Sequence, residues 1–226
     1  GDLIVLAAYF GLTTTVLLGV HPFVALLFVV PAMAGLGYML QRGLLNKTLG
    51  DDILPPLLVT FGLSVIIQNA LLEGYTADPQ KLNGGVIETV IALLQWIFYA
   101  TSIGRGFRAV SDNQDIAQIM GFNKAHVFGL AMALALAVTA VAGILLGMRT
   151  SFDPSVGGGR LIFGFEAVII GGLGNLWGTL AGGVILGVAQ TIGAKIDPGW
   201  QLLAGHIAFL VVLAVRPNGL FPRIDH

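Results

Sequence analysis

The polar connection 104–124 contains residues that are suited to binding another protein. Three apolar side chains recur within it at i, i+3 and i+4, the spacing of one helix face: Ile116, Ile119 and Met120. A short helix whose apolar stripe projects into water is typical of an element that docks in a groove of a partner. The alternative is that the stripe packs on the ends of the protein's own helices.

Residues next to this stripe predict where such a helix begins and ends. Asp112 or Asn113 can cap its start, and Asp115 would lie in its first turn, where the helix dipole favours an anion. Gly121 can adopt the left-handed conformation that ends a helix. The connection is therefore predicted to contain a short, defined helix.

Polar side chains inside apolar runs are candidates for a solute pathway. Thr60, Ser64 and Gln68 recur at i, i+4 and i+8, so they share one helix face, and Asn69 lies beside them. Such a stripe either lines a polar path or joins neighbouring helices through hydrogen bonds. Both interpretations stay open from the sequence.

Two further polar residues lie in the C-terminal third of the chain. Glu166 is an acid within an apolar stretch, and an intramembrane carboxylate suggests function, with Arg160 as a candidate partner. The alternative is an interfacial acid near a helix start, since the apolar stretch begins only at Leu161. Asn175 falls at a glycine-rich break, where interrupted helices expose backbone groups to a substrate.

The sequence contains none of the common hydrolase motifs. There is no phosphate-binding Gly-x-x-x-x-Gly-Lys-Ser/Thr, no paired-His zinc helix, no Gly-x-Ser-x-Gly turn and no cysteine. The four histidines are far apart in the sequence: His21, His126, His206 and His226. We therefore expect no enzyme activity and no metal or other cofactor in this chain. A net charge of −1 with scattered Lys and Arg does not predict nucleic-acid binding.

Long apolar runs must position these residues. Of the 226 residues 56% are hydrophobic and 10% are charged, which predicts a helix bundle in lipid, where one crossing needs about 20 apolar residues. Five crossings are predicted at Leu3–Leu18, Pro22–Leu40, Leu54–Leu72, Val86–Ile103 and Val127–Met148. Leu161–Ala194 is too long for one crossing and is broken at 171–175, which predicts two crossings or a re-entrant pair. Trp200–Val215 brings the expected total to about eight.

The positions of Lys and Arg predict the orientation in the membrane, and the spacing of glycines predicts close helix packing. Lys and Arg gather on the cytoplasmic side of membrane proteins, and alternating placement puts seven of the eleven on one side: Arg42, Lys47, Arg105, Arg108, Lys124, Arg216 and Arg223. This predicts that connection 104–124 is cytoplasmic. Three glycine pairs are spaced for close helix packing: Gly143/Gly147, Gly178/Gly182 and Gly183/Gly187.

Several of these stretches resemble one family of membrane proteins. The spacing Asp115-Ile116-Ala117-x-x-x-Gly121 is similar to the acidic-x-Ala-x-x-x-Gly coupling motif of ABC importer permeases. The wider connection 104–123 resembles the branched-chain amino acid type of these permeases. Four further stretches resemble the same family: residues 60–69, 165–183, 216–221 and the opening Gly1-Asp2 with Ala8-Tyr9. The family's first helix and its Asn-x-Ala-His do not precede Gly1, so we expect a truncated N-terminus. A second departure is that the connection Asp78–Gly85 is shorter than is usual in the family.

The resemblance implies an all-α, polytopic fold and a single permease domain over 1–226, with a cytoplasmic coupling loop at 104–124. The residues implied to couple the chain to an ATPase are Asp115, Ile116, Ala117, Ile119, Met120 and Gly121. The resemblance also implies three kinds of partner in a bacterial-type plasma membrane: ATP-binding subunits, an extracytoplasmic solute-binding protein and a second permease chain, identical or related. ATP would be bound by the partner subunit. Branched-chain amino acids are the first expectation for the solute, with urea or amides as alternatives. A self-sufficient secondary transporter or channel for a small polar solute is the alternative function.

Overall fold

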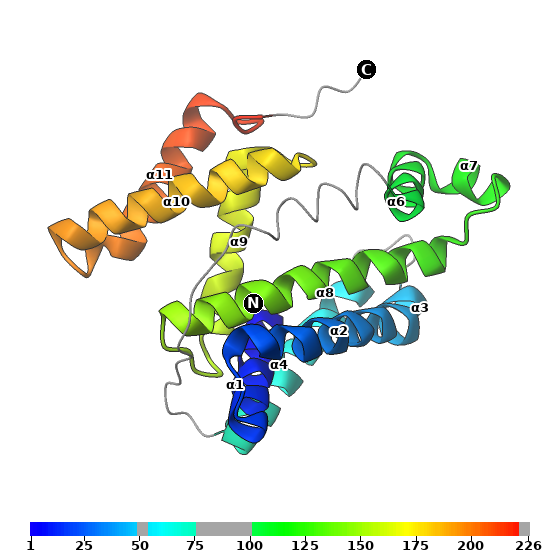
Figure 1. The fold of residues 1–226 in the computed structure, drawn as a ribbon. Coiled ribbons are helices and arrows are strands. Elements are labelled where there is room, and N and C mark those ends of the chain that lie inside the picture. The colour runs from blue at the N-terminus through cyan, green and yellow to red at the C-terminus, as the bar shows by residue number, and fades with distance from the viewer. Residues whose placement is uncertain (49–53, 76–100, 222–226) are drawn as a thin grey trace. The chain divides into compact units, whose positions relative to one another are not determined.

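A computed structural model describes residues 1–48, 54–75 and 101–221 of the protein (Figure 1). The described residues form two compact units, Gly1–Gly157 and Gly158–His226. The first unit contains α1 (Asp2–Leu18), α2 (Pro22–Leu40), η1 (Gln41–Leu45), α3 (Asn46–Thr48), α4 (Leu54–Tyr75), α6 (Ser102–Asp112), α7 (Gln114–Ile119) and α8 (Lys124–Arg149). The second contains α9 (Gly157–Gly171), whose first residue is at the boundary, α10 (Leu176–Ile196) and α11 (Trp200–Val215).

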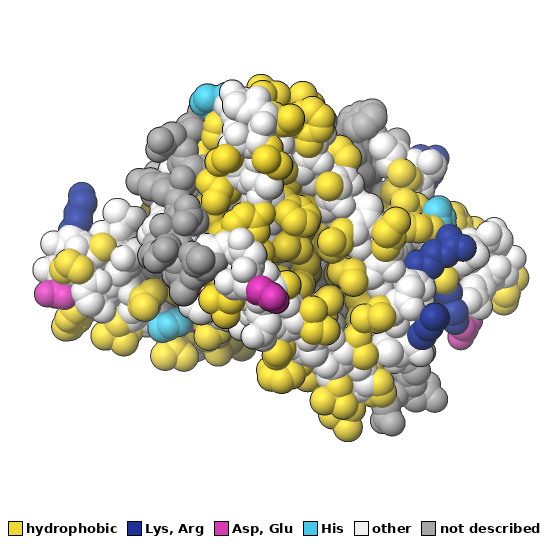
Figure 2. Space-filling view, turned by 90° about the horizontal axis from the view of Figure 1, so that it is seen from below, with side chains coloured by type: hydrophobic (Ala, Val, Ile, Leu, Met, Phe, Trp, Pro, Cys, Tyr) yellow, Lys and Arg dark blue, Asp and Glu magenta, His cyan; other side chains and the backbone are white. Residues whose placement is uncertain are grey.

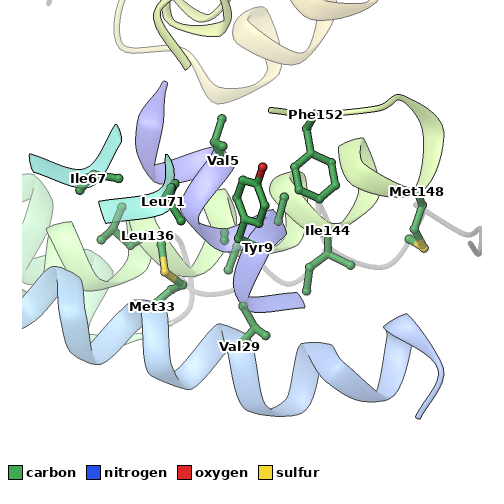
Figure 3. Close-up of a cluster of buried hydrophobic side chains, with 13 residues drawn as sticks. Val5, Tyr9, Val29, Met33, Ile67, Leu71, Leu136, Ile144, Met148 and Phe152 are labelled. Atoms are coloured by element: carbon green, nitrogen blue, oxygen red, sulfur yellow. The ribbon is translucent and has the colours of Figure 1, made fainter. Parts of the chain in front are cut away.

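An antiparallel pair of long helices, α2 and α8, forms the frame of the first unit. Near the end of α2 the Tyr38 hydroxyl lies 2.9 Å from Nδ1 of His126, near the start of α8. Helices α1 and α4 complete one apolar core with this pair (Figure 3). Its largest fully buried side chains include Tyr9, Met33 and Ile144. Burial of these side chains holds the helices in register, because interiors at this packing density tolerate few rearrangements.

Glycine allows the helices of this core to approach closely. A Cβ on Gly143 of α8 would lie 2.5 Å from the carbonyl oxygen of Ile4 on α1, and one on Gly37 of α2 would lie 2.8 Å from the carbonyl oxygen of Met132 on α8. Either contact would require backbone movement. The packing role predicted for Gly143 is therefore confirmed.

Asparagine side chains begin three of the helices. The side-chain oxygens of Asn113, Asn123 and Asn175 accept hydrogen bonds from backbone N–H groups in the first turns of α7, α8 and α10. Each bond satisfies a donor that has no partner inside the helix. These caps place the helix starts at the polar connections, as the sequence pattern requires.

The second unit consists of a hairpin of α10 and α11 with α9 beside it. The hairpin turn is closed by Asp197, whose carboxylate accepts from the backbone N–H of Gly199 at 2.7 Å. Gly182 of α10 lies against α9 so closely that a Cβ would overlap the carbonyl oxygen of Ala167. Gly183 and Gly187 have open space around the Cβ position among the described residues. The predicted packing role is therefore confirmed for Gly182. The pair Gly183/Gly187 has no close neighbour among the described residues.

The end of the described chain closes the break between α9 and α10. Backbone N–H groups of Leu220 and Phe221 donate to the carbonyl oxygens of Ile170 and Gly171, at 2.8 and 3.0 Å. These oxygens belong to the last turn of α9, where no intrahelical donor remains. The stretch 216–221 thus supplies backbone donors to the end of α9, where the interruption at 171–175 begins.

The apolar runs form the helices that the sequence predicts. Four helices of the described part are long and apolar enough to cross a membrane by length and composition: Pro22–Thr48, Leu54–Tyr75, Lys124–Met148 and Leu176–Ile196. Two shorter apolar helices, Asp2–Leu18 and Trp200–Val215, match further predicted runs. The break predicted inside Leu161–Ala194 is confirmed, and the predicted run Val86–Ile103 lies almost wholly outside the described residues. Apolar side chains cover much of the surface in Figure 2.

Candidate functional site

The short helix expected in connection 104–124 is present as α7. The side-chain oxygen of Asn113 accepts from the backbone N–H groups of Asp115 and Ile116, both at 3.0 Å. At the other end Gly121 has a φ of 91°, and the N–H of Phe122 returns to the carbonyl oxygen of Ala117 at 3.0 Å. Both ends of the helix are therefore capped, as the residue types predict.

Helix α7 packs with one side and exposes the other. Ala117 is 1% exposed and joins Val110 and Val127 in a small apolar cluster with α6 and α8. In contrast Ile116, Ile119 and Met120 are 56%, 87% and 68% exposed. Among the described residues the stripe itself therefore stays exposed, and the residue that packs on α6 and α8 is Ala117, which lies outside the stripe. Three large apolar side chains remain exposed at the tip of a capped helix.

Two members of the polar stripe on α4 converge on a carboxylate of α1. Oγ of Ser64 donates to Oδ2 of Asp2 at 2.5 Å, and Nε2 of Gln68 donates to Oδ1 of Asp2 at 2.7 Å. Both donors lie near the middle of α4. Asp2 is partly buried and forms no ion pair within the described part of the chain. We call Asp2, Ser64 and Gln68 the α1/α4 polar site.

The other two members of that stripe bond to their own helix. Thr60 donates to the carbonyl oxygen of Leu57 at 2.9 Å, and Asn69 donates to that of Val65 at 2.8 Å. Both side chains are exposed. Ser64 and Gln68 therefore share Asp2 as a hydrogen-bond partner, and Thr60 and Asn69 lie outside this site.

Sequence reasoning missed Asp2. Its position at the first helical residue of an apolar run marks a helix start, where acids are common because of the dipole. The sequence did offer one indication, because Asp2 is the only charged residue in this helix of 17 residues. Only the crossing of α1 and α4 reveals that this acid meets Ser64 and Gln68.

Glu166 is a buried residue and its partner differs from the one expected. It lies within α9, is 5% exposed, and Oε1 contacts Nδ1 of His206 on α11. Glu166 thus pairs with His206 and not with Arg160 in the described residues, while its depth in the membrane stays a prediction. His206 is 40 positions from Glu166 in the sequence, so only tertiary packing brings the two side chains together. Oε2 of Glu166 has no hydrogen-bond partner among the described residues.

We expect His206→Ala to destabilise the protein by about 2 kcal/mol, because it leaves both oxygens of a buried carboxylate without a donor. The double variant Glu166→Leu/His206→Leu should recover most of this loss, since it removes the buried polar group together with its partner. Thermal unfolding of the purified protein in detergent measures both. A double variant as unstable as His206→Ala would show that the Glu166 contact is not the cause.

Asn175 has a structural function at the glycine-rich break. Its side-chain oxygen accepts from the backbone N–H of Gly178 at 3.0 Å, and its amide nitrogen donates to the carbonyl oxygen of Phe221 at 3.2 Å. Both hydrogen-bonding ends of the amide are thereby used within the second unit. A role of Asn175 in the solute pathway stays a prediction.

A resident metal has no evident set of ligands in the part of the chain that the structure describes. No three residues of the types His, Cys, Asp and Glu gather there closely enough to hold an ion. The chemistry that the described polar residues offer is hydrogen bonding and charge, at the α1/α4 polar site and at the Glu166–His206 pair.

Comparisons with known proteins identify one family of transport proteins. Residues 3–215 match the model of a family described as the branched-chain amino acid transport system permease component. BraD of Pseudomonas aeruginosa, a high-affinity branched-chain amino acid transport system permease protein, is 28% identical over 249 residues, which cover 97% of this chain and 80% of BraD.

Two further relatives carry the same description. The permease protein LivH of Salmonella typhimurium is 27% identical over 94% of this chain and 77% of its own length. A probable LivH of Methanocaldococcus jannaschii is 27% identical over 97% of this chain and 81% of its own length. No solved structure matches the chain. Because the family model covers nearly the whole sequence, the chain belongs to the family of permease components of branched-chain amino acid transport systems.

Proposed function

We propose that this chain is the membrane permease subunit of an ABC importer and that it translocates branched-chain amino acids. It acts as a single permease domain over residues 1–226, with about eight membrane segments in a bacterial-type plasma membrane. The solute arrives from an extracytoplasmic binding protein, and a second permease chain, identical or related, completes the translocation unit. ATP is bound and hydrolysed by separate cytoplasmic subunits, and this chain needs no cofactor.

The exposed stripe of α7 is the observation that carries this proposal. Ile116, Ile119 and Met120 are large apolar side chains on a helix that the chain holds rigidly through Asn113 and Ala117. A rigid, capped helix with an apolar tip transmits movement, whereas a flexible loop would absorb it. The stripe therefore suits a groove on an ATP-binding subunit.

Coupling follows from this placement. Asp115 lies in the first turn of α7, Gly121 follows its last turn, and Ala117 anchors it to α6 and α8. When the ATP-binding subunits close, they move the docked stripe, and α8 carries this displacement into the helix bundle. The polar residues inside the bundle then meet the solute as the membrane helices reorient.

Transport assays with the assembled importer test the proposal. The chain is co-expressed with the ATP-binding subunit, permease partner and binding protein encoded beside it, and the complex is reconstituted into liposomes. We expect uptake of leucine, isoleucine and valine that requires both internal ATP and the binding protein. Uptake in the absence of the ATP-binding subunit would instead identify a self-sufficient transporter, and transport of urea or an amide alone would overturn the assignment of the solute.

A further inference from the structure

The α1/α4 polar site places a carboxylate beside the middle of an apolar helix. Asp2 meets Ser64 and Gln68, which lie near the centre of α4. A charged group at such a depth is costly unless it is compensated, and charged residues inside membrane helices usually serve a substrate or ion. Within the described residues Asp2 has two neutral side-chain donors and forms no ion pair.

The two donors hold the carboxylate in one orientation. Ser64 binds one oxygen and Gln68 binds the other, so neither oxygen can rotate freely. Each carboxylate oxygen has a further lone pair that can accept another hydrogen bond. Asp2 is also partly accessible, unlike the fully buried Tyr9 on the same helix. The site is therefore preorganised to accept one more donor.

The neighbourhood of the carboxylate is apolar on one side. Val5 lies one helix turn from Asp2, and Ile67 and Leu71 lie one turn from Ser64 and Gln68. These three side chains belong to the same apolar cluster between α1 and α4 (Figure 3). Because these three side chains are themselves only 1%, 9% and 4% exposed, the recognition that the site offers is that of a positive, hydrogen-bonding head group.

We propose that Asp2 receives the ammonium group of the transported amino acid, with Ser64 and Gln68 as positioning residues. This inference rests on the proposed function and assigns to one residue the recognition of the amino group. The ammonium group donates to the carboxylate oxygens that Ser64 and Gln68 hold in place. The site thereby selects amines over neutral solutes.

Binding of leucine analogues to the purified complex tests this recognition without the binding protein. The probes share one hydrocarbon body: 3-methylbutylamine has the ammonium group, 3-methylbutanol has a hydroxyl, and 4-methylpentanoate has only the carboxylate. We expect the amine alone to raise the melting temperature of the wild-type complex. Equal stabilisation by the alcohol would overturn the proposal, because the ammonium group would then not be recognised.

Variants locate the effect at Asp2. Asp2→Asn keeps the size and removes the charge; its amide oxygen can accept from Gln68 while its amide nitrogen donates to the Ser64 hydroxyl. It should abolish stabilisation by the amine. It should also lower leucine uptake by about tenfold or more, the scale of losing a charge-assisted contact, while ATPase stimulation by the binding protein persists. Asp197→Asn is the matched control, since it makes the same change at the exposed α10/α11 turn, and should behave like wild type.

The two proposals fail separately. Wild-type uptake of leucine together with normal uptake by Asp2→Asn would overturn the role of Asp2 and leave the proposed function intact. Amine binding that depends on Asp2, in a complex that transports no amino acid, would overturn the proposed function alone. If Asp2→Asn does not assemble, the three probes still test recognition of an ammonium group, and Ser64→Ala tests its place because it removes one donor that positions the carboxylate. Unchanged stabilisation of Ser64→Ala by the amine would overturn the role of this site.

Discussion

Ile119→Asp should abolish ATP-driven uptake by the assembled importer while the permease itself stays folded. Ile119 is 87% exposed, so the substitution removes nothing from the protein's own core. At a docked interface the same change buries a carboxylate without a partner, and central apolar contacts of this kind cost about 2 kcal/mol or more when lost. This corresponds to a loss of about 30-fold in affinity for the ATP-binding subunit.

The measurement is co-purification of the ATP-binding subunit, together with uptake and stimulated ATPase activity in liposomes. Gln118→Asp is the matched control, because it adds the same charge to the same helix at an exposed polar position without removing an apolar side chain. We expect Gln118→Asp to retain most of its activity. Normal assembly and uptake by Ile119→Asp, with the helix intact, would show that α7 does not dock on the ATPase.

Gly182→Val should prevent α9 and α10 from packing and destabilise the protein by about 3 kcal/mol or more. The Cβ would overlap the carbonyl oxygen of Ala167 and would lie 3.0 Å from the backbone nitrogen of Gly171. Both obstacles are backbone atoms, which cannot move aside as a side-chain tip can. The two helices must separate, and the close contacts between them are lost.

The adjacent glycine provides the control for this prediction. Gly183→Val adds the same branched side chain at the next position of α10, where nothing lies within 4 Å of the Cβ position. We expect it to melt close to wild type, since lipid accommodates an apolar side chain as well as protein does. Equal stability of Gly182→Val and Gly183→Val in detergent would mean that this helix contact contributes nothing.

The amino-acid sequence was sufficient to determine the local structure of this protein. Apolar runs of sufficient length form helices in lipid whatever surrounds them, because every backbone group must be bonded within the segment. The capping residues of α7 are equally local, since Asn113 and Gly121 act within a few residues along the chain. For this reason the helix runs within the described residues and the short polar helix could be predicted.

Tertiary structure alone decided which polar residues meet. Asp2 and Ser64 are 62 residues apart, and Glu166 and His206 are 40 apart, so no periodicity along the chain relates them. It also separated two similar glycine pairs, because Gly182 touches α9 and Gly183 faces open space. A pattern along one helix states which residues share a face, but only the crossing of helices determines what that face contacts. Helix starts and apolar stripes could therefore be predicted from the sequence, whereas the partners of Asp2 and Glu166 could not.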